Sequence, residues 1–167
     1  MGRRQSKLEI TARQWLAERG VTIDDIADLV FFLQSPYHED LALDHCIEHV
    51  NYVLAKREVQ NAILTGIQLD RLAEQHKLDE PLQQTIHSDE SLFGIDEVIA
   101  LAIVNVYGSI GFTNYGYVDK LKPGILKHLN DPSTGECHTF LDDIVGAIAA
   151  AASSRLAHAT ADDQMDD

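Results

Sequence analysis

Cysteine, proline and positive charge are scarce in this 167-residue chain. It holds two cysteines, four prolines and one tryptophan, and its 13 Lys and Arg residues are outnumbered by 27 Asp and Glu residues, giving a net charge of −14. Two cysteines without metal-ligand spacing exclude a disulfide framework and a cysteine-based zinc module. The shortage of Lys and Arg argues against a general nucleic-acid-binding protein, which must neutralise phosphates.

Long hydrophobic runs are also missing. The longest apolar stretches, around residues 98–107 and 144–152, fall short of the roughly 18 residues that a membrane-spanning helix needs. The charged and polar start "MGRRQSKLEI" predicts no signal peptide. We therefore expect a cytoplasmic protein, with peripheral contact at the inner membrane face as the alternative location.

Apolar residues recur at helical spacing along nearly the whole chain, and no alternating run of strand length is present. Ser6 and Glu9 form a capping-box pattern before the first helix. The pattern predicts an all-α fold: a single multihelical domain over residues 1–159, in which central hydrophobic helices are surrounded by amphipathic ones. The acidic tail, residues 160–167, is predicted to be disordered. A helix over 117–130 should bend or break at Pro123-Gly124.

Two pairs of acids open the two most apolar helices. The segments "GIDEVIA" (94–100) and "FLDDIVG" (140–146) share the order apolar, Asp, acid, aliphatic, aliphatic. If the two helix starts meet in the core, Asp96, Glu97, Asp142 and Asp143 converge, and four close carboxylates repel one another unless a cation or protons intervene. Mg²⁺ takes oxygen ligands and is the natural occupant. The alternative is that each pair only stabilises the start of its own helix.

The segment "GSIGFTNYG" (108–116) follows the first of these helices and is predicted to be a glycine-rich loop. Backbone N–H groups in such a loop can hold phosphate oxygens. It is not a Walker A loop, because Tyr117 stands where that motif needs lysine. The candidate phosphate-binding residues are Gly108, Ser109, Gly111, Thr113, Asn114 and Lys120.

The segments "DESLFGIDEVIALAIVNVYGSIGFTNYGYVDKLKPGIL" and "FLDDIVGA" resemble the small soluble Gram-positive branch of the phosphatidylglycerophosphatase A family. The resemblance implies hydrolysis of the phosphate monoester of phosphatidylglycerophosphate, with Mg²⁺, at the cytoplasmic membrane face. The residues that match the family's motifs are Asp142, Asp143, Gly146, Gly108, Ser109 and Gly111. The second position of the late acidic motif is usually Glu in the membrane-anchored branch, whereas this chain has Asp143.

The leading hypothesis is therefore a Mg²⁺-dependent phosphatase acting on a phosphorylated lipid or a small phosphate ester. Asp142 and Asp143 are its candidate catalytic residues and, with Asp96 and Glu97, its candidate metal ligands. A second hypothesis is a non-catalytic scaffold of the same fold that binds a phosphorylated ligand or a protein partner. A third is an all-α nucleotide pyrophosphatase, although such enzymes usually place their acids at i and i+3 and not in adjacent pairs.

Overall fold

The computed structural model describes residues 3–165, and the side chains of residues 3–160. Within this range the chain is helical and has no β-strand, which confirms the all-α prediction. The helices are α1 (Lys7–Glu18), α2 (Ile23–Gln34), α3 (Leu43–Leu54), α4 (Arg57–Glu74), α5 (Leu82–His87), α6 (Ile95–Val104), α7 (Ser109–Leu121), α8 (Ile125–Leu129) and α9 (Leu141–Met165). Three short 3₁₀ turns complete the order: η1 (Ser35–Tyr37), η2 (Asn105–Tyr107) and η3 (Pro132–Thr134).

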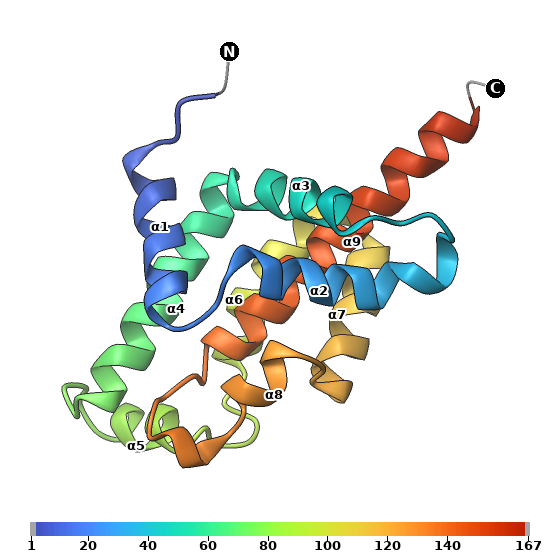
Figure 1. The fold of residues 1–167 in the computed structure, drawn as a ribbon. Helices are drawn as coiled ribbons and strands as arrows, with labels where there is room; N and C mark the ends of the chain where they lie inside the picture. The colour runs from blue at the N-terminus through green and yellow to red at the C-terminus, as the bar shows by residue number, and fades with distance from the viewer. Residues whose placement is uncertain (1–2, 166–167) are drawn as a thin grey trace.

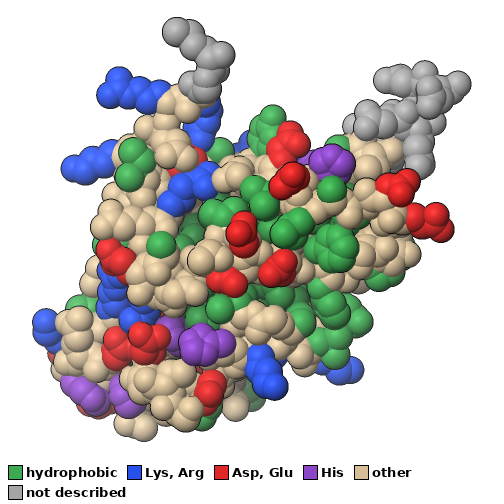
Figure 2. Space-filling model, in the orientation of Figure 1, with side chains coloured by type: hydrophobic (Ala, Val, Ile, Leu, Met, Phe, Trp, Pro, Cys, Tyr) green, Lys and Arg blue, Asp and Glu red, His purple; other side chains and the backbone are tan. Residues whose placement is uncertain are grey.

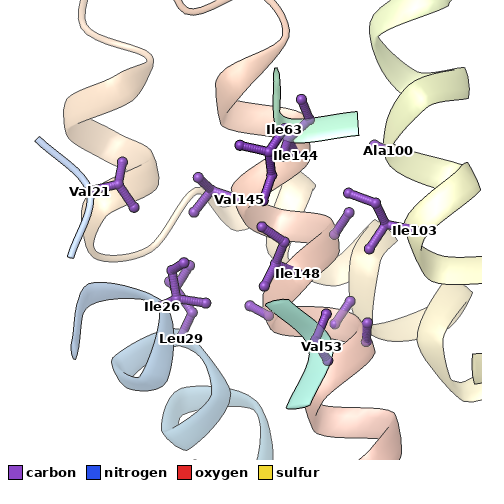
Figure 3. Close-up of a cluster of buried hydrophobic side chains, with 14 of the residues drawn as sticks. Val21, Ile26, Leu29, Val53, Ile63, Ala100, Ile103, Ile144, Val145 and Ile148 are labelled. Atoms are coloured by element: carbon purple, nitrogen blue, oxygen red, sulfur yellow. The ribbon is translucent and has the colours of Figure 1, made fainter. Parts of the chain in front are cut away.

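Helix α9 runs through the middle of the fold, and α2, α3, α4, α6, α7 and α8 pack against it (Figure 1). Every residue from 137 to 154 is buried. Figure 3 shows Ile144 and Ile148 of α9 lying between side chains of α2, α3, α4 and α6. A helix that is apolar all round must be covered on every side, and these neighbours cover it. Helix α6 is less enclosed, because Ile95 and Val98 are half exposed.

Several local boundaries follow from the sequence. The Ser6 hydroxyl accepts a hydrogen bond from the backbone N–H of Glu9 at 3.1 Å, at the start of α1. Thr22 and Asp25 form a reciprocal capping box at the start of α2. The predicted break at Pro123-Gly124 is confirmed, since it separates α7 from α8.

The prediction of a glycine-rich loop over 108–116 is wrong. Only Gly108 has a left-handed φ there, at +80°, and α7 begins at the next residue. Gly111 serves packing instead, because a Cβ built on it would lie 3.0 Å from the Cγ1 atom of Val104. Two of the three glycines are thus accommodated inside a helix that packs against α9.

At the other end of the chain, α9 continues to Met165, beyond residue 159, at which the predicted domain ends. The helix therefore includes most of the segment that was expected to form a disordered tail. Residues 166 and 167 lie outside the described range.

The N-terminal end of α9 is held by a side chain from another helix. Asp70, on α4, is fully buried, and its carboxylate accepts the backbone N–H groups of Phe140 and Leu141, each at 3.0 Å. The first N–H groups of a helix have no partner within the helix, so a buried start needs an acceptor from elsewhere. Asp70 supplies that acceptor and fixes the position at which α9 begins.

Gly66 lets α4 approach α9 closely. A Cβ built on Gly66 would lie 2.3 Å from Cδ1 of Ile144 and 3.0 Å from Cβ of Phe140. No room for a methyl group exists there, because both neighbours are fully buried.

On the surface, apolar side chains gather over the region of α2 and α7, whereas Lys and Arg gather near α1 and α4 (Figure 2). The rings of Phe32 and Tyr117 stack with their centroids 6.0 Å apart. This pair ties α2 to α7 outside the main core.

Substitution of Gly66 by Ala should destabilise the fold. Overpacking typically costs about 1–3 kcal/mol, while Ala in place of Gly within a helix recovers up to about 1 kcal/mol. We expect a net loss of about 1 kcal/mol in the free energy of unfolding, measured by urea titration. The matched control is Gly116→Ala on α7, where a Cβ meets nothing within 4 Å and stability should hold or rise. Equal effects of the two substitutions would contradict the close approach.

Substitution of Asp70 by Ala should cost more. It leaves the buried N–H groups of Phe140 and Leu141 without an acceptor, at about 1–3 kcal/mol each. We expect a loss of about 2–6 kcal/mol in total by the same urea titration. Asp24→Ala, which removes an exposed acid in the first turn of α2, should change stability by less than about 1 kcal/mol. An Asp70→Ala protein as stable as the wild type would show that α9 does not depend on this cap.

Candidate metal centre

Carboxylates from three helices meet at the start of α9. Asp142 and Asp143 lie in the first turn of α9, Asp96 in the first turn of α6, and Asp119 near the end of α7. One oxygen from each of Asp119, Asp142 and Asp143 lies within 4.8 Å of the others. These side chains and Asp96 line a cavity of about 220 Å³. The starts of α6 and α9 therefore meet at one site.

Tyr115 of α7 and Lys122, the residue that follows α7, hold the acids of α9 in place. The Lys122 ammonium donates to Oδ1 of Asp119 at 2.5 Å and to Oδ2 of Asp142 at 3.1 Å. The Tyr115 hydroxyl donates to Oδ1 of Asp143 at 3.3 Å. These contacts differ from simple helix capping, since the side chains bridge α9 to α7.

One oxygen of the cluster has no partner. Oδ1 of Asp142 is buried and accepts no hydrogen bond from the described residues, although the residue itself is only 6% exposed. A buried charged oxygen without a partner is costly and calls for a ligand. Three carboxylate donors from Asp119, Asp142 and Asp143 suit a hard divalent cation such as Mg²⁺. The residues present therefore fit a metal ion.

The electrostatics of the cluster favour a bound proton or cation. Burial raises the pKa of Asp143 to about 10, and the neighbouring charges of Asp142 and Asp96 add to the effect. Burial also raises the pKa of Asp142 to about 6, although the Lys122 ammonium opposes this rise. Burial lowers the pKa of Lys122, but Asp142 and Asp119 more than compensate, so the pKa lies above its usual value.

The two acids of α6 are placed differently. Asp96 is half-buried and lies beside Asp143, where its carboxylate helps to raise the pKa of Asp143. Glu97 lines the same cavity but is exposed, and it is outside the group of acids whose oxygens lie within 4.8 Å of one another. Asp89, from the loop before α6, also lines the cavity, and burial raises its pKa.

The candidate phosphate-binding residues do not join this cavity. Ser109, Thr113 and Asn114 line a separate cavity of about 440 Å³ with residues of α2, η1 and α9. The Ser154 hydroxyl donates to the Tyr107 carbonyl at 2.9 Å, which places the start of α7 beside the later turns of α9. Since Ser154 lies eleven residues beyond Asp143, about 16 Å of helix separates that point from the carboxylates.

The other candidates of this group are also apart from the acids. Gly111 is buried against Val104, Gly108 is exposed at the start of α7, and the Lys120 side chain is exposed. Lys122, two residues further on, is the lysine that faces the carboxylates.

Sequence reasoning missed three residues of the centre: Tyr115, Asp119 and Lys122. A signal for them existed, because their spacings of four and three place them on one face of a helix. Because residues 108–116 were expected to form a loop, Tyr115 was not placed on the same helix face as Asp119 and Lys122.

No helix among the described residues is both long and apolar enough to cross a membrane.

The chain is similar to proteins from several bacilli and from Listeria. It is 72% identical to the uncharacterized protein YutG of Bacillus subtilis over 92% of each chain. A solved structure of a protein of unknown function from Bacillus stearothermophilus is 72% identical, with a TM-score of 0.90 over 93% of this chain and 96% of that one. The low temperature requirement C protein of Listeria monocytogenes is 66% identical, with a TM-score of 0.92 over 94% and 99%.

A sequence model of the phosphatidylglycerophosphatase A family matches residues 13–158. This range contains the cluster of Asp119, Asp142 and Asp143, as well as Asp96 on α6. The chain belongs to the phosphatidylglycerophosphatase A family.

Proposed function

We propose that the chain is a Mg²⁺-dependent phosphate monoester hydrolase that acts on phosphatidylglycerophosphate or a related lipid phosphate. The observation that carries this proposal is the buried cluster of Asp119, Asp142 and Asp143, with Oδ1 of Asp142 unpartnered. Family membership supports the reaction class.

In this proposal Asp119, Asp142 and Asp143 hold the ion. When bound, Mg²⁺ supplies a Lewis acid that polarises the phosphoryl oxygens. The protein contributes the geometry: Tyr115 orients Asp143 through its hydroxyl, and Asp70 fixes the start of α9 on which both acids lie. Burial keeps bulk water away from these groups and strengthens their interactions.

Two further carboxylates at the cavity, Asp96 and Asp89, would accept and donate the protons that the reaction moves. Water attacks phosphorus, one P–O bond forms, and the bond to the alcohol oxygen breaks, so a proton must leave the water and another must reach the alcohol. Asp96 is half-buried beside Asp143 and is placed to accept the proton of the attacking water. Asp89 lines the same cavity, and its raised pKa suits the return of a proton to the alcohol.

Apolar side chains beside the cavity support a lipid substrate. Leu92 lines the cavity and is fully exposed, at 101%. Phe93, the next residue, also lines the cavity and is partly exposed. Apolar side chains beside a polar cavity match an ester whose phosphate is polar and whose alcohol carries acyl chains.

Asp142→Asn tests the site. The substitution keeps the size of the side chain but removes one charge and one hard ligand. We expect Mg²⁺ to stabilise the wild type, by about 2.7 kcal/mol at 100 times its dissociation constant, and to give the variant a much smaller shift in melting temperature. Turnover of lipid phosphate should fall by orders of magnitude. The control Asp24→Asn changes an exposed acid at the start of α2 and should behave as wild type.

Two outcomes would overturn the proposal in different ways. If the wild type shows no Mg²⁺-dependent shift at millimolar metal and hydrolyses no phosphate monoester, the family scaffold binds a ligand or partner without catalysis. If it hydrolyses nucleoside triphosphates and leaves lipid phosphate intact, the chemistry stands and the substrate class is wrong.

Metal binding should strengthen as the pH rises. The raised pKa values of Asp142 and Asp143 mean that the cluster holds protons which the ion must displace. Between pH 7 and 9, where the pair holds about one proton, the apparent affinity for Mg²⁺ should rise by up to about tenfold per pH unit. Melting curves at a series of Mg²⁺ concentrations measure this dependence. A dissociation constant that does not change over this range would contradict a proton-holding cluster.

A further inference from the structure

Lys122 is the only positively charged side chain among the residues that line the carboxylate cavity. Seven acids line the same cavity. The ammonium contacts both Asp119 and Asp142, which are two of the three acids whose oxygens come within 4.8 Å of one another. Lys122 therefore provides the positive charge that these two acids need in the absence of metal.

The backbone of Lys122 supports this placement. The residue follows the last residue of α7 and is in a left-handed conformation, with φ 47° and ψ 52°, and its N–H donates to the Val118 carbonyl at 2.8 Å. This conformation is strained for a residue other than glycine, and it persists only where the surrounding structure imposes it. The turn directs the side chain back to Asp119, three residues earlier, and across to Asp142 on α9.

The lysine and a metal ion would be bound by two of the same acids, Asp119 and Asp142. The ammonium occupies Oδ1 of Asp119 and Oδ2 of Asp142, whereas Oδ1 of Asp142 has no partner. An ion held by Asp119, Asp142 and Asp143 would lie against two of the carboxylates that Lys122 contacts, and two cations this close repel each other.

We propose that Lys122 is an internal counter-ion that occupies the carboxylate cluster in place of the divalent ion, and that binding of the ion displaces it. This inference rests on the proposed metal site. The flexible four-carbon stem lets the displaced ammonium remain at the cavity, where it can pair with the phosphate of the substrate. Lys122 then has two partners in turn: the carboxylates before the metal binds and the phosphate afterwards.

If Lys122 and Mg²⁺ compete for the same carboxylates, removal of the lysine should raise the affinity for Mg²⁺. Lys122→Met should bind Mg²⁺ roughly tenfold more tightly than the wild type, because the coupling between the two cations is reciprocal. Titration calorimetry with Mg²⁺ alone measures this, and turnover of lipid phosphate should fall in the same variant. The matched control Lys120→Met removes an exposed lysine of the same helix and should leave the affinity unchanged.

Labelling of the wild type tests the displacement without any substitution, and so remains decisive if Lys122→Met fails to fold. Lysine acetylation by an activated ester, followed by mass spectrometry, should modify Lys122 slowly without metal and several-fold faster with Mg²⁺. Lys120 should react at the same rate in both conditions. Unchanged labelling of Lys122, or unchanged or weaker Mg²⁺ affinity in Lys122→Met, would overturn the counter-ion role.

These results separate the counter-ion role from the proposed function. A wild type that binds Mg²⁺ and hydrolyses lipid phosphate, with no effect of Lys122→Met on affinity, keeps the function and removes the counter-ion. Binding by Lys122→Met but not by wild type keeps the counter-ion and removes Mg²⁺-dependent hydrolysis by the natural chain. Absence of metal binding in both proteins removes both.

Discussion

The structure depends on how the buried start of α9 is held. Asp70 of α4 accepts the N–H groups of Phe140 and Leu141, so the most enclosed helix begins at a defined position inside the protein. The position at which α9 begins also fixes where the next two residues, Asp142 and Asp143, lie. Their position is therefore set by packing between α4 and α9, which Gly66 makes close enough.

Acids at this position concentrate negative charge in a buried site, and this charge must be balanced. The starts of α6 and α9 carry the positive ends of two helix dipoles, which favour nearby carboxylates, but each dipole end is equivalent to only about half a charge. The acids that line the cavity exceed what two such ends can balance. The contact of Lys122 with Asp142, the raised pKa of Asp143 and the unpartnered oxygen of Asp142 all reflect this excess of negative charge. A divalent ion would resolve it.

The sequence predicted the acids of the centre better than their surroundings. The repeated pattern of "GIDEVIA" and "FLDDIVG" could be recognised because two adjacent acids at the head of an apolar helix are unusual. The helical spacing of Tyr115, Asp119 and Lys122 was overlooked because the density of glycines was taken as evidence for a loop. Gly111 shows why that inference failed, since glycine there permits close packing against Val104 within a helix. Asp70 carried no local signal at all, because its role exists only after α4 and α9 meet.

A crystal structure of the protein soaked with Mn²⁺ would show whether the cluster binds a divalent ion, because anomalous scattering locates this substitute for Mg²⁺ without reference to activity. We expect one ion bonded to carboxylate oxygens of Asp119, Asp142 and Asp143, with metal–oxygen distances of about 2.0–2.3 Å, and the Lys122 ammonium moved away from Asp142. An ion bound elsewhere, or a cluster that stays free of Mn²⁺ at millimolar concentration while Lys122 keeps both contacts, would contradict this expectation.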